Sequence, residues 1–141
     1  MTTLERLGAD HLRAVVLGFR DALRAHQETI NRLNVYPVPD GDTGTNMALT
    51  LESVVAELEA AGADMAATCK AVSHGSLMGA RGNSGVILSQ ILRGMAATFA
   101  EGDGAGLDGA GLAGALAAAS EGAYGAVMRP VTGEASRVVV G

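Results

Sequence analysis

The residues with the clearest chemical potential lie in the segment 34–46, which reads Asn-Val-Tyr-Pro-Val-Pro-Asp-Gly-Asp-Thr-Gly-Thr-Asn. Asp40 and Asp42 are hard oxygen ligands, and a turn at the intervening Gly41 can aim both carboxylates at one cation or at a pair of cations. Mg²⁺ suits such a site because it takes one or two protein carboxylates and completes its shell with water and substrate phosphates. The segment therefore predicts a site for a metal and a phosphate.

Simpler interpretations of the same residues stay open. Asp-Gly-Asp is also an ordinary surface turn, and Thr43 or Thr45 can serve only as a helix N-cap. A calcium-binding EF-hand loop is excluded, because Thr45 stands where that loop needs Gly and Leu51 stands where it needs Glu. The metal interpretation gains from Pro37 and Pro39, which stiffen the approach to the carboxylates, since a catalytic site needs rigid positioning.

The small residues after the carboxylates are placed to meet phosphate. Thr43, Gly44, Thr45 and Asn46 enter a predicted helix, so their backbone N–H groups and hydroxyls can contact phosphate oxygens at the positive end of the helix dipole. The dipole contributes only about 0.3–1 kcal/mol per interaction. Bound cations must therefore supply most of the charge neutralisation.

A second segment, 74–85, reads His-Gly-Ser-Leu-Met-Gly-Ala-Arg-Gly-Asn-Ser-Gly and leads into another predicted helix. Its glycines allow the backbone to approach a ligand, and Asn83 or Ser84 can donate to a phosphate. Glycines that only pack helices together explain the pattern equally well, and Arg81 is either a phosphate clamp or a solvated side chain. The segment is not a Walker A loop, because it lacks Gly-Lys-Ser/Thr and no strand precedes it.

The elements that must position these segments are predicted to be helices. Apolar spacing predicts helices over 4–30 (one helix, or two that abut near 8–10), from 45 or 46 to about 60, from the N-cap Asp64 to 72, over 86–99 and over 112–127. The stretches 34–40, 75–85 and 101–111 are predicted as connectors or loops. No convincing period-2 strand occurs, so the fold class is all-α.

Composition limits the class of protein. The 141 residues carry a net charge of −5, which argues against a nucleic-acid partner because no basic stripe is available to neutralise phosphates. The single Cys69 excludes an internal disulfide and is expected to be a small buried residue in a reducing compartment. No apolar run approaches the roughly 18 residues of a membrane span, and no signal peptide is recognised. We expect a cytoplasmic protein.

The segments 34–47 and 79–90 together resemble the N-terminal kinase domain of the ATP-binding subunit of bacterial fatty-acid kinase, which is related to the nucleotide-binding L subunit of dihydroxyacetone kinase. The resemblance extends from about Leu12 to Val131 and includes Ala-Val-Met-Arg-Pro-Val at 126–131. It implies an antiparallel helix bundle or barrel that holds ATP and Mg²⁺ at one end.

The resemblance also implies roles by position. Asp40 and Asp42 would be the catalytic carboxylates that bind Mg²⁺, with Asn34 beside them in the metal shell. Phosphate contacts would come from one side from Thr43, Gly44, Thr45 and Asn46, and from the other side from Gly79, Ala80, Gly82, Asn83 and Ser84.

The implied activity is transfer of the γ-phosphoryl group of ATP to the carboxylate of a fatty acid that a separate partner subunit holds. The alternatives are a dihydroxyacetone-kinase-like subunit, or a non-catalytic fragment that binds nucleotide or a partner protein. A homodimer is a further expectation for the full-length form.

The resemblance also sets the expected domain division. Residues 1–131 are expected to form a partial ATP- and Mg-binding kinase domain. Residues 132–141 are expected to form a divergent or frayed tail, because 132–137 lack the Glu-Gly-Thr continuation expected after Val131. Since the family domain continues for several more helices, the bundle is expected to be incomplete at its C-terminal end and to leave apolar helix faces exposed.

Overall fold

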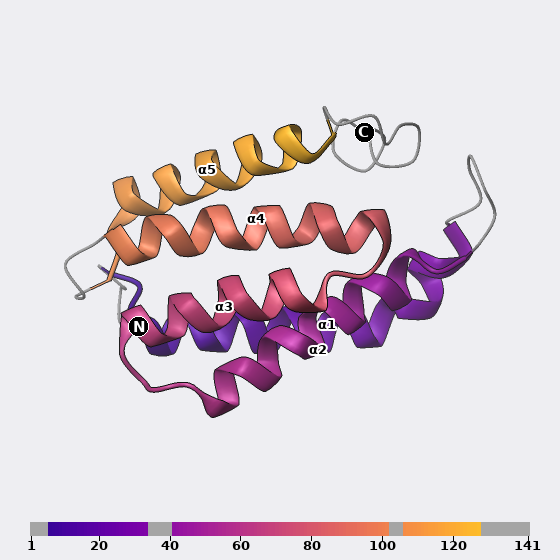
Figure 1. Cartoon of the computed structure of the whole chain (residues 1–141), viewed down its shortest axis with the longest axis horizontal. Coiled ribbons are helices and arrows are strands. Elements are labelled where there is room, and N and C mark those ends of the chain that lie inside the picture. The colour runs from indigo at the N-terminus through magenta and orange to yellow at the C-terminus, as the bar shows by residue number, and fades with distance from the viewer. Residues whose placement is uncertain (1–5, 34–40, 102–105, 128–141) are drawn as a thin grey trace, which may run out of the picture.

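The computed structural model of the chain describes residues 6–33, 41–101 and 106–127. The helices in these ranges are α1 (Ala9–Leu33), α2 (Thr43–Ala60), α3 (Met65–Gly79), α4 (Gly82–Glu101) and α5 (Gly109–Val127). Consecutive helices pack against each other and alternate in direction (Figure 1). The starts of α2 and α4 therefore lie at one end of the bundle, together with the end of α3. The predicted all-α helix bundle is confirmed.

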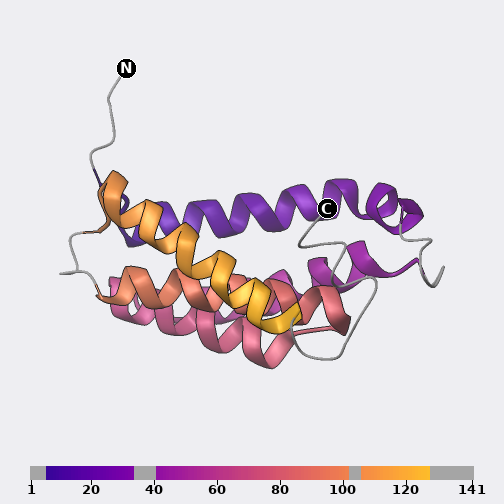
Figure 2. The same cartoon turned by 90° about the horizontal axis from the view of Figure 1, so that it is seen from above.

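Helix α2 packs against α1, α3 and α4. Its Leu51 and Val54 side chains are completely buried. Helix α5 packs on α4 alone among the described helices and crosses it obliquely (Figure 2). A single backbone bridge, in which Leu7 and Leu107 exchange hydrogen bonds of 2.7 and 3.0 Å, ties the chain before α1 to the chain before α5.

Several helix boundaries differ from the sequence prediction, among them the start of α4, which lies at Gly82 and not at residue 86. Helix α2 begins at Thr43, with Asp42 in the N-cap position, so neither Thr43 nor Thr45 is the N-cap. Helix α3 begins after Asp64 as predicted, but it continues to Gly79 instead of ending at residue 72. Helix α5 begins at Gly109, inside a stretch that was predicted to be a loop.

The longer α3 has a direct physical cause in the contact of its glycines with α2. A Cβ atom on Gly75 would lie only 2.8 Å from the Val54 Cα and 3.1 Å from the Ser53 carbonyl oxygen. A Cβ atom on Gly79 would overlap the Ser53 side chain. Close packing of two helices thus offsets the low helix propensity of glycine. The prediction of a Gly-rich loop over 75–85 is wrong for residues 75–79, where the glycines pack α3 on α2, and for residues 82–85, which begin α4.

Large apolar side chains are exposed on all five helices, most often on α1. Helix α1 buries Leu12, Val16 and Leu23, whereas Val15 and Phe19 on the same helix are 60% and 37% exposed. Helix α5 exposes Leu116 and Tyr124. Each of the two helices therefore has a face that no other described helix covers.

Two further expectations concern burial and hydropathy. Cys69 is buried as predicted, and this burial raises the pKa of its thiol. None of the helices in the described part of the chain is both long enough and apolar enough to span a bilayer. The predicted tail over 132–141 lies outside the described residues.

The contact between α2 and α3 yields a stability prediction. Gly75→Ala is expected to destabilise the fold by about 1–3 kcal/mol, because forcing the helices apart outweighs a gain of ~1 kcal/mol in helix propensity. Gly18→Ala is the matched control, since nothing lies within 4 Å of a Cβ atom on this glycine of α1. The control should stabilise the protein by about 0.5–1 kcal/mol. Urea unfolding followed by circular dichroism measures both, and equal effects would contradict the packing argument.

Candidate functional site

The first predicted segment supplies the start of α2. Gly41 has φ +64°, a left-handed conformation that favours glycine, directly before Asp42 and the start of α2. Asp42 follows at the N-cap position with an exposed side chain that makes no capping hydrogen bond to α2. Asn34 and Asp40 lie outside the described residues, so their predicted metal contacts remain predictions.

The last turns of α1 hold the first turn of α2 through Thr45. The Thr45 hydroxyl accepts hydrogen bonds from Asn31 Nδ2 at 2.9 Å and from Gln27 Nε2 at 3.1 Å. The Thr45 backbone N–H donates to Asn31 Oδ1 at 3.1 Å. Because Asn31 occupies this N–H, the group of Thr45 that is placed to meet a phosphate is its hydroxyl. The hydroxyl of Thr45 retains its own proton for donation.

Gly44 brings the backbones of α1 and α2 together at the same place. The residue is buried, and a Cβ atom on it would lie 2.5 Å from the Gln27 carbonyl oxygen and 3.1 Å from the Ile30 Cβ. Any larger residue would push α2 away from α1 and break the bonds to Thr45. Gly44 therefore has a packing role, whatever its backbone N–H contacts.

The second predicted segment supplies the start of α4, directly beside α2. Only Ala80 and Arg81 separate α3 from α4. The Arg81 backbone N–H donates to the Thr50 hydroxyl at 3.2 Å, and that hydroxyl donates to the Asn46 carbonyl oxygen at 2.8 Å. Gly82 has φ +65°, and a Cβ atom on it would lie 2.5 Å from the Asn46 side-chain nitrogen. The second segment thus lies directly against Asn46 and Thr50 on α2.

The structure therefore joins two segments that lie more than thirty positions apart in the chain, as the separation of 31 between Thr50 and Arg81 shows. At their junction, Asn83 is exposed and Ser84 is half-buried in the first turn of α4. Ala80 is half-buried, whereas Gly79 is buried against Ser53. Close packing on Ser53 of α2 therefore explains why residue 79, one of the predicted site residues, is a glycine.

This junction has the donor chemistry that phosphate requires. The first-turn N–H groups of a helix have no partner within that helix, and here the positive ends of α2 and α4 lie at the same end of the bundle. Side-chain donors at the two starts are the Thr45 hydroxyl, the Asn46 amide, Asn83 and Ser84. The exposed Arg81 lies between them in sequence and adds a positive charge.

A Mg²⁺ ion also fits this donor set. Among the described residues, no group of three or more His, Cys, Asp and Glu side chains lies close enough to hold a metal. Mg²⁺ does not need such a cage, because it binds through one or two carboxylates, water and phosphate oxygens. The Asp42 carboxylate, exposed at the start of α2, is a ligand of this kind.

Sequence reasoning missed Gln27, Asn31 and Thr50. A signal for the first two was present, since the buried positions 12, 16 and 23 of α1 continue at 27 and 31 with helical spacing. Polar residues on a core-facing stripe require polar partners. No local pattern distinguishes Thr50 from an ordinary helical threonine.

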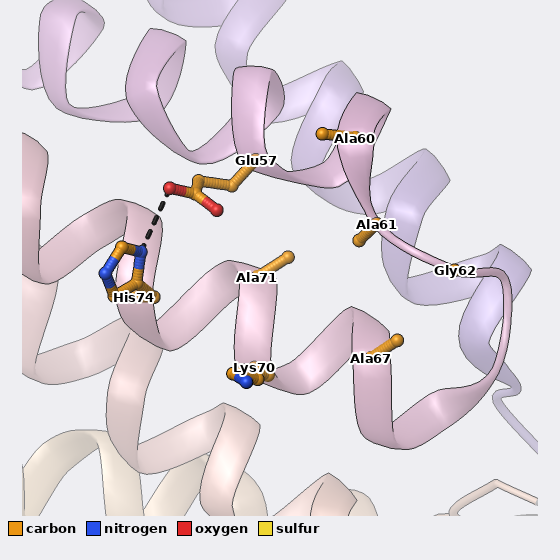
Figure 3. A pocket seen from close by; sticks show the side chains of 8 residues that line it. All are labelled: Glu57, Ala60, Ala61, Gly62, Ala67, Lys70, Ala71 and His74. Atoms are coloured by element: carbon orange, nitrogen blue, oxygen red, sulfur yellow. Dashed lines mark hydrogen bonds and ion pairs between the residues drawn. The ribbon is translucent and has the colours of Figure 1, made fainter.

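A separate cavity of about 350 Å³ lies between α2 and α3 (Figure 3). Half of its lining residues are alanines, and the exposed His74 makes a 2.9 Å hydrogen bond with the partly buried Glu57, which also lines it. It contains no predicted site residue. Its residues on α2 begin at Glu57, about 20 Å along the helix from Thr43 at 1.5 Å per residue. The cavity is therefore distinct from the junction of α2 and α4.

Comparison with known proteins finds one matching family model, described as the DAK2 domain, over residues 37–134. Protein YloV of Bacillus subtilis is 43% identical over 120 residues, which are 84% of this chain and 21% of that protein. An uncharacterized protein of Staphylococcus epidermidis is 46% identical over 112 residues, which are 79% of this chain and 20% of that protein. The chain spans about a fifth of the length of these curated relatives.

The link between α2 and α4 can be tested through Thr50, whose side chain is completely buried. Thr50→Val keeps the shape but leaves the Arg81 N–H without its acceptor, so we expect a destabilisation of about 1–3 kcal/mol. Thr98→Val is the control, because the Thr98 hydroxyl bonds only to the Gly94 carbonyl of its own helix. The control should change the free energy of unfolding by no more than about 0.5 kcal/mol. A Thr50→Val protein as stable as the control would contradict the role of this bond.

Proposed function

Because this chain belongs to the DAK2-domain family, we propose that the starts of α2 and α4 together bind Mg²⁺ and ATP for phosphoryl transfer. The DAK2 domain is a domain of kinases of the dihydroxyacetone-kinase type. Phosphoryl transfer relies on positioning and on charge neutralisation more than on a protein nucleophile. The junction of the two helix starts offers both.

One observation carries this proposal. The starts of α2 and α4 lie side by side, because Arg81 donates to Thr50 and Gly82 packs on the Asn46 amide. Two sets of first-turn N–H groups can then contact one polyphosphate from two sides. An isolated Gly-rich turn or an isolated Asp-Gly-Asp turn would not supply this arrangement.

The proposed site has a metal-binding part and two phosphate-binding parts. Asp42 holds Mg²⁺ together with Asp40 and Asn34, whose positions lie outside the described residues. When bound, the metal neutralises charge on the phosphate oxygens. The first turn of α2, at Thr43, Gly44, Thr45 and Asn46, binds phosphate from one side. The backbone over 79–82, with Asn83 and Ser84, binds it from the other side.

We propose a fatty-acid carboxylate, held by a partner subunit, as the phosphoryl acceptor. A carboxylate oxygen attacks the γ-phosphorus, the bond from this phosphorus to the oxygen bridging it to the β-phosphorus breaks, and ADP leaves with an acyl phosphate as the other product. The acceptor is already ionised at neutral pH, so the chain need not remove a proton from it. The Pro-Val-Pro-Asp-Gly-Asp-Thr form of the segment 37–43 favours this acceptor.

The second candidate acceptor is the hydroxyl of a small ketone such as dihydroxyacetone, which the family description favours. A hydroxyl must lose its proton during transfer, so this reaction needs a general base in addition to the metal site. Binding of nucleotide without turnover, even with a partner subunit present, would instead favour a non-catalytic role. Turnover assays with a fatty acid and with dihydroxyacetone therefore distinguish the two acceptors from each other and from a non-catalytic role.

Asp42→Asn tests the proposed site. Calorimetry of the wild-type chain should show ATP binding that depends on Mg²⁺, and the substitution should weaken it by about tenfold or more, which corresponds to ~1.4 kcal/mol. The physical reason is that the neutral amide removes one of the anionic ligands of the metal. The affinity for ATP without Mg²⁺ should change much less.

Asp64→Asn is the matched control, because it makes the same charge change at the start of α3. The Asp64 side chain makes no capping hydrogen bond, so the fold should tolerate the change. A well-folded wild-type chain that binds no nucleotide would contradict the proposal, as would equal losses in the two variants.

A further inference from the structure

The amide of Asn31 makes a two-point contact with Thr45, and we propose that Asn31 is a positioning residue that aims the Thr45 hydroxyl proton at the bound phosphate. This inference rests on the proposed function, because it deepens the description of the same site. Asn31 lies on α1, outside the segments 34–46 and 74–85, so the inference adds a third part of the chain to the binding site.

The two bonds between these residues fix the orientation of the Asn31 side chain. Its Oδ1 accepts the Thr45 backbone N–H at 3.1 Å, so the oxygen must face that N–H. Its Nδ2 then donates to the Thr45 Oγ1 at 2.9 Å. The reverse orientation would set two donors against each other at the backbone N–H, so this network determines the amide assignment.

Donor and acceptor counting then determines what the Thr45 hydroxyl can do. A hydroxyl oxygen has two acceptor positions and one proton. Asn31 fills one acceptor position and Gln27 fills the other at 3.1 Å. With both amide nitrogens facing the Thr45 oxygen as they do in the structure, its proton points away from them, and the described residues show no hydrogen bond donated by this hydroxyl. An anionic oxygen at the start of α2 is the acceptor that completes this arrangement.

The surrounding packing makes the arrangement rigid. Gly44 brings the backbone of α2 onto α1, where a Cβ atom would lie 3.0 Å from the Asn31 Oδ1. Thr45, Asn31 and Gln27 are all partly buried, so water competes little for their hydrogen bonds. The first turn of α2 is thus held in place before a ligand arrives, which lowers the ordering cost of binding.

Asn31→Asp is the most informative variant, because it keeps the shape and the Oδ1 acceptor while it removes the Nδ2 donor. The second carboxylate oxygen can only accept, so the Thr45 proton turns toward Asp and away from the phosphate. Thr45→Val removes the hydroxyl with little change of shape. Thr45→Ser keeps the hydroxyl and serves as the conservative replacement. Glu28→Gln, at an exposed position of α1, is the control.

The experiment is a double-mutant cycle on the dissociation constant for Mg²⁺–ATP, measured by calorimetry on the full chain. Asn31→Asp and Thr45→Val should each weaken binding by about tenfold, since hydrogen bonds to charged groups contribute this much. In the double variant, Asn31→Asp should have almost no further effect, because its target is gone. Thr45→Ser and Glu28→Gln should bind Mg²⁺–ATP with a dissociation constant within about threefold of that of the wild type, because neither removes a group of this hydrogen-bond network.

The possible outcomes separate this inference from the proposed function. If Asn31→Asp weakens binding equally with and without the Thr45 hydroxyl, its effect is only the added negative charge, and the inference is wrong. A variant that unfolds earlier in urea but binds ATP as tightly as the wild type would show a purely structural role and would also overturn it. Nucleotide binding that responds to Asp42→Asn but not to Asn31→Asp overturns the inference alone. A folded wild-type chain without nucleotide binding overturns both.

Discussion

The candidate site depends on close contact between α2 and the segment 75–85, which glycines make possible at each turn. Along one stripe of α2, Val54 faces Gly75, Ser53 faces Gly79, Thr50 faces Gly85 and Asn46 faces Gly82. Side chains at these glycines would separate α2 from α3 and from the start of α4. Because the contact ends at Asn46, in the first turns of α2, the start of α4 comes to lie beside the start of α2.

Helix α1 completes the arrangement from the other side of α2. Gly44 allows α1 and α2 to touch through their backbones, and the amides of Gln27 and Asn31 hold Thr45. The first turn of α2 is thus fixed by contacts from both α1 and the 80–82 connection. Fixed N–H groups and hydroxyls at two adjacent helix starts suit a polyphosphate, since a preorganised site does not lose binding energy to ordering.

The sequence predicts the helices well, because they are local patterns. The periodic apolar residues of α1 and the left-handed conformation of Gly41 need no knowledge of the rest of the chain. The sequence does not predict that α3 continues to Gly79, because glycine is a poor helix former in isolation. The contact of Gly75 with Val54, which offsets this low propensity, exists only in the folded chain. The hydrogen bonds of Asn31 could not be predicted for the same reason, since its partner Thr45 lies 14 residues away on another helix.

Amide NMR can show directly whether the two helix starts form one binding site. A Mg²⁺ complex of a non-hydrolysable ATP analogue is added to the isotope-labelled chain, and every backbone amide signal is followed. If the two starts form one site, signals from 43–46 and from 82–84 shift together with one dissociation constant, while those of 70–74 beside the separate cavity stay in place. Shifts confined to one helix start, or centred on that cavity, would contradict it.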